Sequence, residues 1–121
     1  MLINLSNHPF EDWDEKQLGV ARERWGQIID LPFPMISPTL TTPKLQALAQ
    51  EYCCECVERI RTSADTSSAV HLMGEMVFCY NLITLLKAAG ITVVASTTER
   101  EVFYINNVKN SKFKFVAFRE Y

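Results

Sequence analysis

The segment Ser6-Asn7-His8-Pro9 places a hydroxyl, an amide and an imidazole within one turn near the start of the chain. Histidine titrates close to neutral pH, so His8 can act as a general acid or donate to a phosphate oxygen. Alternatively, Ser6 and Asn7 only satisfy the backbone of a turn and His8 is a solvated loop residue. We take Ser6 and His8 as candidate catalytic residues and Asn7 as a candidate ligand-binding residue.

A second polar segment is Ser96-Thr97-Thr98-Glu99-Arg100, where three consecutive hydroxyls precede an acid and an arginine. This pattern predicts a loop rich in hydrogen-bond donors. Arg100 can bind a phosphate through two parallel hydrogen bonds and keeps its charge at any working pH. The competing interpretation is a polar turn with a Glu99–Arg100 surface pair. We expect Arg100 to act in catalysis, and Ser96, Thr97 and Thr98 to bind a ligand.

Gly74 and Glu75 stand where a predicted strand meets a predicted helix, and free N–H groups at such a junction attract anions. One glycine is a weak signal, and neither the dinucleotide fingerprint nor the P-loop pattern is present. Glu75 also has a structural explanation, because acids stabilise the positive end of a helix. Both residues are candidate ligand-binding residues. His71 lies inside an apolar strand pattern, and we expect it to be a core or interface histidine.

Alternating strands and helices must position these segments. We expect strands at 2–6, 27–33, 69–73 and 91–95, helices at 14–25, 42–60 and 75–89, and a hairpin of strands at 101–106 and 111–118. Strands that alternate with helices pair in parallel through right-handed crossovers. The sequence therefore predicts one Rossmann-like, three-layer α/β domain over residues 1–121, with a mostly parallel sheet of about four strands, three helices and a C-terminal hairpin.

Ligands of open parallel sheets bind beyond the carboxyl ends of the strands. The three polar segments follow such ends, so we expect them to form one site at one edge of the sheet. The hairpin would extend the sheet or pair with a second subunit.

Charge and hydropathy restrict the classes of partner. The 121 residues carry a net charge of −2, with a pI of about 5.7. This slightly negative net charge argues against an extended binding surface for duplex nucleic acid or for an anionic membrane, but it allows a small anionic ligand. No apolar run approaches the roughly 20 residues that span a bilayer, and the first strand leaves no room for a signal peptide. We expect a cytoplasmic protein.

The four cysteines lie on two predicted helices at spacings that suit neither a disulfide nor a metal site: Cys53, Cys54, Cys56 and Cys79. We expect free thiols, and we expect the protein to use no metal or other cofactor.

The run Leu5-Ser6-Asn7-His8-Pro9, at the end of a short first strand on a chain of this length, resembles the small CRISPR-associated ring nucleases of type III systems. The resemblance implies a homodimeric, Rossmann-like, metal-independent enzyme. Such enzymes degrade cyclic oligoadenylate second messengers to linear products with 2′,3′-cyclic phosphate ends, which switches off antiviral signalling. Only Ser6 and His8 match the motif directly, and His8 would protonate the leaving 5′-oxygen. The other candidates are placed by position alone.

Two other classes of function stay open. The same pocket could serve a sensor or sponge that binds cyclic nucleotides without turnover. The apolar hairpin could instead be the edge by which a structural or regulatory protein joins another subunit.

Overall fold

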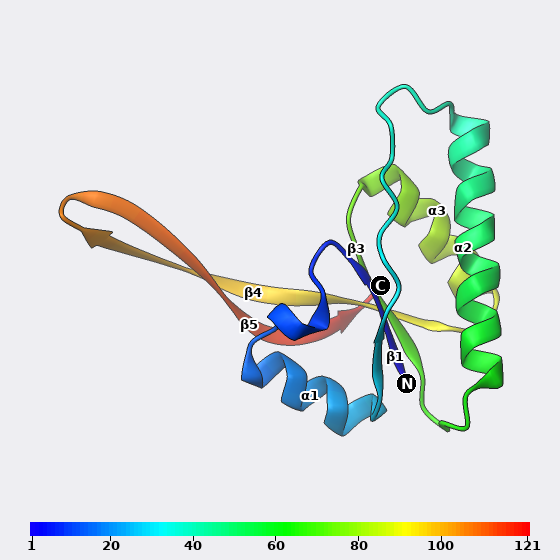
Figure 1. The fold of residues 1–121 in the computed structure, drawn as a ribbon, viewed down its shortest axis with the longest axis horizontal. Helices are drawn as coiled ribbons and strands as arrows, with labels where there is room; N and C mark the ends of the chain where they lie inside the picture. Colours follow the sequence, from blue (N-terminus) through cyan, green and yellow to red (C-terminus); the bar gives the residue numbers. More distant parts are fainter.

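The computed structural model describes residues 1–121 as a five-stranded sheet with helices on both faces (Figure 1). The strand order is β2-β1-β3-β4-β5, in which the first four strands run parallel and β5 runs antiparallel to β4. The strands are β1 (Leu2–Ser6), β2 (Ile28–Asp30), β3 (Ala69–Met73), β4 (Thr92–Ile105) and β5 (Val108–Glu120). The helices are α1 (Glu15–Trp25), α2 (Thr42–Thr62) and α3 (Met76–Ala88), and a 3₁₀ turn covers Phe10–Asp12.

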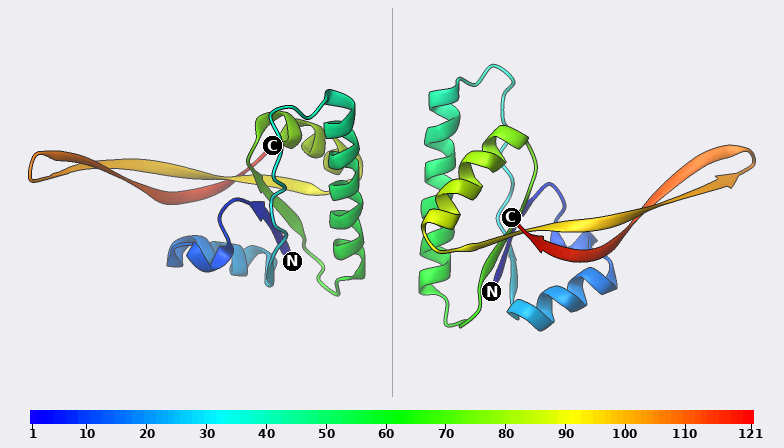
Figure 2. Two further views of the ribbon diagram at one scale, coloured as in Figure 1. Left: turned by 45° about the horizontal axis from the view of Figure 1, so that its top comes forward. Right: turned by 180° about the vertical axis from the view of Figure 1, so that it is seen from behind.

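Successive side chains of each strand point to opposite faces of the sheet, and this divides the core into two layers. Side chains at odd positions of β1, such as Ile3 and Leu5, pack with residues of α2 and α3. Side chains on the other face, such as Leu2 of β1 and Ala69 of β3, pack with α1 and with the end of β5. The predicted three-layer α/β arrangement is therefore present, with α1 on one face and the pair α2–α3 on the other (Figure 2).

The ends of α1 follow from its sequence. The Asp14 carboxylate accepts the backbone N–H of Gln17 at 2.7 Å, and the helix ends at Gly26, whose φ of 76° is a conformation that favours glycine. The helix α2 begins at Thr42, as predicted, and its capping residue Thr41 makes no side-chain capping bond.

The prediction of a loop at residues 96–100 is wrong, because β4 continues unbroken from Thr92 to Ile105. The antiparallel partner β5 pairs with it from Val94 to Ile105, so the backbone of the polar run is satisfied by a ladder. Threonine is itself a good strand former. The predicted fourth strand and the first hairpin strand are thus one strand, and the sheet is mixed, with five strands rather than about four.

Two features shape this hairpin. A register shift at Thr97/Thr98 marks a β-bulge, which bends and twists a strand pair. Asn106 and Asn107 both have positive φ, 50° and 65°, as a two-residue type I′ turn requires. Beyond the bulge, residues 98–115 project far from the body of the domain (Figures 1 and 2). We call this segment the arm. No helix in the structure has the length and apolar character needed to cross a bilayer.

Gly74 is required at the end of β3, because a Cβ at this position would overlap the ring of Phe33. That ring packs edge-on against Phe78, with 5.3 Å between ring centroids, and would have to shift from this contact to admit the Cβ. We predict that Gly74→Ala lowers the free energy of unfolding by about 1–3 kcal/mol, as measured by urea denaturation.

The matched control is Gly19→Ala in the exposed middle of α1, where nothing lies within 4 Å of the added carbon. That change should raise stability by up to about 1 kcal/mol. Equal effects of the two substitutions would contradict the account of Gly74.

Candidate functional site

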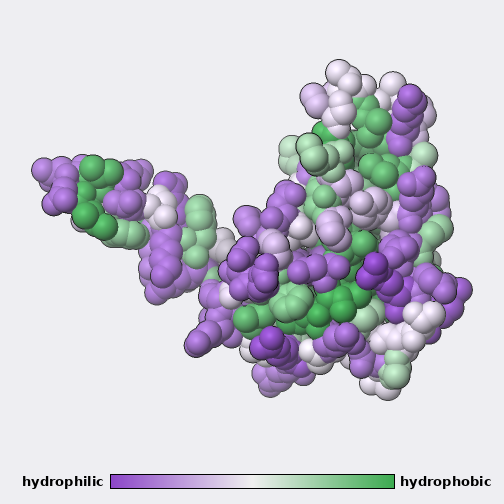
Figure 3. Space-filling model, viewed as in Figure 1, coloured by the Kyte–Doolittle hydropathy of each residue, from purple (hydrophilic) through white to green (hydrophobic).

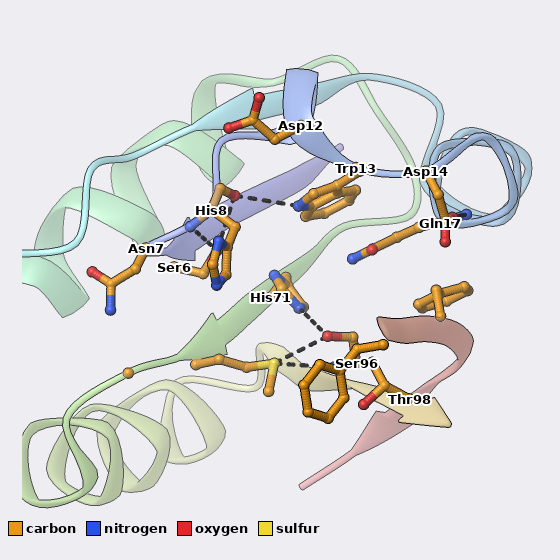
Figure 4. Close-up of a pocket in the computed structure, with 14 residues that line it drawn as sticks. Ser6, Asn7, His8, Asp12, Trp13, Asp14, Gln17, His71, Ser96 and Thr98 are labelled. Carbon is orange, nitrogen blue, oxygen red and sulfur yellow. Dashed lines mark hydrogen bonds between the residues drawn. The ribbon is translucent and has the colours of Figure 1, made fainter. Parts of the chain in front are cut away.

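A pocket of about 560 Å³ opens on the α1 side of the sheet, at the carboxyl ends of β1 and β3 and at the base of the arm (Figure 4). Its lining comes from four segments: the loop after β1, the start of α1, the end of β3 and the base of the arm. The lining residues are Ser6, Asn7, His8, Asp12, Trp13, Asp14, Gln17, His71, Met73, Gly74, Ser96, Thr98, Phe113 and Phe115.

Beneath the pocket lies a polar network that contains all three buried polar residues of the chain, Asn4, Ser6 and His71. Asn4 is its centre. The Asn4 amide oxygen lies 2.9 Å from both His71 Nδ1 and Ser6 Oγ. Its amide nitrogen donates to the His8 carbonyl and to Asp30 Oδ1, each at 2.8 Å. Every buried polar side-chain atom has a partner, so the network is complete.

These contacts determine the tautomer of His71. The Asn4 nitrogen faces two oxygens that can only accept, the His8 carbonyl and the Asp30 carboxylate, so the orientation of the amide is fixed. The amide oxygen therefore accepts, and His71 must donate from Nδ1. In the neutral ring, Nε2 then carries the lone pair and serves as an acceptor.

Burial, and to a smaller extent the charge of the nearby His8, lowers the pKa of His71 from its usual 6.5 to about 4. His71 is 2% exposed, and its ring lies edge-on to Trp13 and Phe118, with centroids 5.1 and 5.6 Å away. The ring is therefore neutral at pH 7. The expectation of a buried histidine is confirmed, yet His71 also lines the pocket.

Ser96 links His71 to the pocket. The Ser96 hydroxyl lies 3.3 Å from His71 Nε2 and 3.1 Å from the sulfur of Met73. Because Nε2 is an acceptor, the hydroxyl can donate its proton to it. The chain Ser96–His71–Asn4 resembles in its geometry the hydroxyl, base and orienting group of nucleophilic sites. It can accept a proton from a molecule in the pocket.

His8 lies on the loop after β1 and also lines the pocket (Figure 4). Its carbonyl accepts from Asn4 Nδ2 and from Trp13 Nε1, the latter at 3.2 Å. Its backbone N–H lies 3.3 Å from Ser6 Oγ. The backbone of His8 is thus held on three sides, while the residue as a whole is exposed. The imidazole is free to meet a ligand.

Six of the predicted site residues line this pocket together: Ser6, Asn7, His8, Gly74, Ser96 and Thr98. The expectation that the three polar segments converge is met for these residues. The hydroxyl of Ser6 is engaged in the network, where it positions Asn4 and the backbone of His8.

Three predicted residues lie elsewhere. The Glu75 carboxylate accepts the N–H groups of Val77 and Phe78 and caps α3, beside a different cavity. Thr97 donates to the carbonyl of Ala117 and does not line the pocket. Arg100 lies farther along the arm, with its guanidinium 3.0 and 3.2 Å from Ser111 Oγ. Thr97 and Arg100 were placed in a loop that is a strand. Alternation turns Thr97 to the face opposite Thr98, and the extended strand carries Arg100 away from the pocket.

Sequence reasoning missed the part that His71 plays, and it missed the aromatic walls. One signal was available, because Asn4 and Ser6 occupy alternate positions in an otherwise apolar strand and must share one face. The contribution of Trp13, Phe113 and Phe115 depends on how α1 and the hairpin fold over that face, which local pattern does not specify.

The pocket lining includes Asp12 and Asp14 but no lysine or arginine. No cluster of three potential metal-ligating side chains occurs in the structure. The four cysteines are free thiols, as expected, and lie outside the pocket. Burial is the main cause that raises the pKa of Cys56 to about 12 and that of Cys79 to about 11, so these thiols stay protonated at neutral pH.

The lowered pKa of His71 makes stability depend on pH. The unfolded chain binds a proton at His71 near pH 6.5, whereas the folded chain does so only near pH 4. Stability from the neutral ring is complete above pH 6.5 and is lost as the pH falls from 6.5 to 4, by about 2 kcal/mol at pH 5. We predict that His71→Gln is less stable at pH 7 but loses about 2 kcal/mol less than the wild type between pH 7 and 5.

Urea denaturation at both pH values measures the difference. His8→Gln removes only the smaller of the two causes and leaves the burial of His71 in place, so it should keep most of the wild-type pH dependence. If His71→Gln lost as much stability as the wild type over this range, His71 would not be a buried neutral group.

The comparisons with curated proteins and with solved structures found no match. The scan of family models found one that covers residues 1–119, almost the whole chain. The chain therefore belongs to the family described as the uncharacterized protein MJ1673 family.

Proposed function

We propose that this protein is a metal-independent ring nuclease that cleaves cyclic oligoadenylate to linear products with 2′,3′-cyclic phosphate ends. It would act in the cytoplasm as a homodimer and switch off type III CRISPR antiviral signalling. The observation that carries the proposal is that two histidines, His8 and His71, line one pocket. The substrate class comes from the resemblance of the Ser6–Pro9 motif to that group of enzymes.

Cleavage of a phosphodiester by its neighbouring 2′-hydroxyl needs a base on one side and an acid on the other. The bond from O2′ to phosphorus forms as the bond from phosphorus to O5′ breaks. The 2′-hydroxyl proton passes to the Ser96–His71 pair, and His8 supplies a proton to the departing O5′. No water is consumed, which accounts for the cyclic phosphate end.

The network under the pocket supports this division of roles. Asn4 holds Nε2 of His71 as the acceptor, and burial keeps that nitrogen unprotonated at neutral pH. His8 is exposed on a loop whose backbone is fixed, so its imidazole can donate while its position is retained. Preorganised groups of this kind lower the barrier without rearranging during the reaction.

The aromatic walls suit the bases of a single-stranded ligand. Trp13, Phe113 and Phe115 line the pocket around the two histidines, and unstacked bases commonly pack on such rings. The other candidate function is a non-catalytic sensor or sponge, which would use the same walls and leave the ring intact.

We predict cleavage of cyclic tri-, tetra- or hexa-adenylate in the presence of EDTA, measured by chromatography with the protein in excess. His8→Ala should reduce the cleavage rate about 10²–10⁴-fold, with a modest change in affinity, because it removes the general acid. Ser96→Ala should also slow cleavage, because it interrupts the path to His71.

Glu75→Gln is the contrasting variant. The carboxylate caps α3 away from the pocket, so this change should lower stability by up to about 1 kcal/mol and leave the cleavage rate unchanged. Rings that stay intact throughout would refute the nuclease. Tight binding measured by calorimetry without cleavage, with His8→Ala altering affinity alone, would select the sensor.

A further inference from the structure

The arm carries apolar side chains that nothing in the chain covers. Tyr104 is 69% exposed and Phe113 is 64% exposed, and Val102, Phe103, Ile105 and Val108 are also exposed. Figure 3 shows an apolar cluster near the tip of the arm, well away from the body. A two-stranded ribbon without a covered face is at best marginally stable in water. The exposed area therefore points to a partner.

The two faces of the arm differ in charge. Thr98 and its cross-strand partner Phe115 line the pocket, so alternation assigns one face to the pocket side. This pocket-side face comprises Thr98, Arg100, Val102, Tyr104, Lys109, Ser111, Phe113 and Phe115. It holds two cations and no acid. The opposite face pairs Glu99 with Lys114 and Glu101 with Lys112, and it includes the ion pair between Lys114 and Glu101 at 2.8 Å.

The rim of the pocket has the complementary charge. Glu11, Asp12, Asp14 and Glu15 follow one another around Trp13, and all four are exposed. None of them takes part in an ion pair, and neither does Arg100 or Lys109. We call residues 11–15 the acidic rim. One molecule thus presents an uncompensated cationic, aromatic face and an uncompensated acidic surface.

We propose that the arm binds a second copy of this chain, with the pocket-side face of each arm docked on the acidic rim of the other copy. Two such contacts related by a two-fold axis are self-complementary and close into a dimer. The arm is long enough, because eight residues from Thr98 to Ile105 span about 26 Å, whereas a domain of this size has a radius of gyration of about 14 Å. The proposal does not depend on the proposed reaction.

Charge-reversal variants test this contact without any substrate. The first variant is Arg100→Glu with Lys109→Glu on the pocket-side face. The second is Glu11→Lys with Asp12→Lys and Glu15→Lys on the rim, which leaves Asp14 in place to cap α1. We expect the wild type to be a dimer by sedimentation velocity at micromolar concentrations, and each variant alone to be a monomer. An equimolar mixture of the two variants should form a heterodimer, because each arm then meets a rim of opposite charge.

The matched control reverses two cations on the other face of the same arm, Lys112→Glu with Lys114→Glu, and should remain a dimer. Circular dichroism and thermal unfolding establish that each variant is folded. A monomeric wild type would overturn the proposal. So would a mixture that stays monomeric, or a control that dissociates as fully as the pocket-side variant.

Discussion

The amide of Asn4 is the constraint on which the site depends. It lies at the middle of β1, is 1% exposed, and joins three strands and a loop through its four hydrogen bonds. A buried amide is costly unless all its groups are paired, and here all of them are. That completeness fixes the orientation of Asn4, and the orientation in turn fixes the acceptor nitrogen of His71 and the backbone of His8. One polar residue in an apolar strand therefore positions both histidines.

The hairpin gives this small domain the surface that we propose for association. The base of the arm, just beyond the bulge, closes one side of the pocket with Phe113 and Phe115. The same alternation that turns Ser96 and Thr98 toward the pocket turns Arg100 and Tyr104 to the pocket side farther out. The pocket and the proposed docking face are thus one continuous surface of the sheet, which relates ligand binding to association of two chains.

Local pattern was sufficient for much of the fold. The order of strands and helices, the caps of α1 and the burial of His71 were all predictable, because each depends on periodicity or on neighbouring residues. The Ser96–Arg100 segment was mispredicted because polar composition favours a loop only where no partner strand is available. The long β5 supplies that partner through pairing between distant residues. Asn4 and His71 are also distant in sequence, 67 positions apart, so local pattern did not predict the hydrogen bond between them.

The most direct test of the account is the protonation state of His71, read from side-chain ¹⁵N shifts of histidine-labelled protein across a pH titration. We predict a neutral ring with its proton on Nδ1 and an unprotonated Nε2, which persists from pH 7 down to about pH 4. A wild-type ring that carries its proton on Nε2, or that titrates near pH 6.5, would contradict the central role of Asn4.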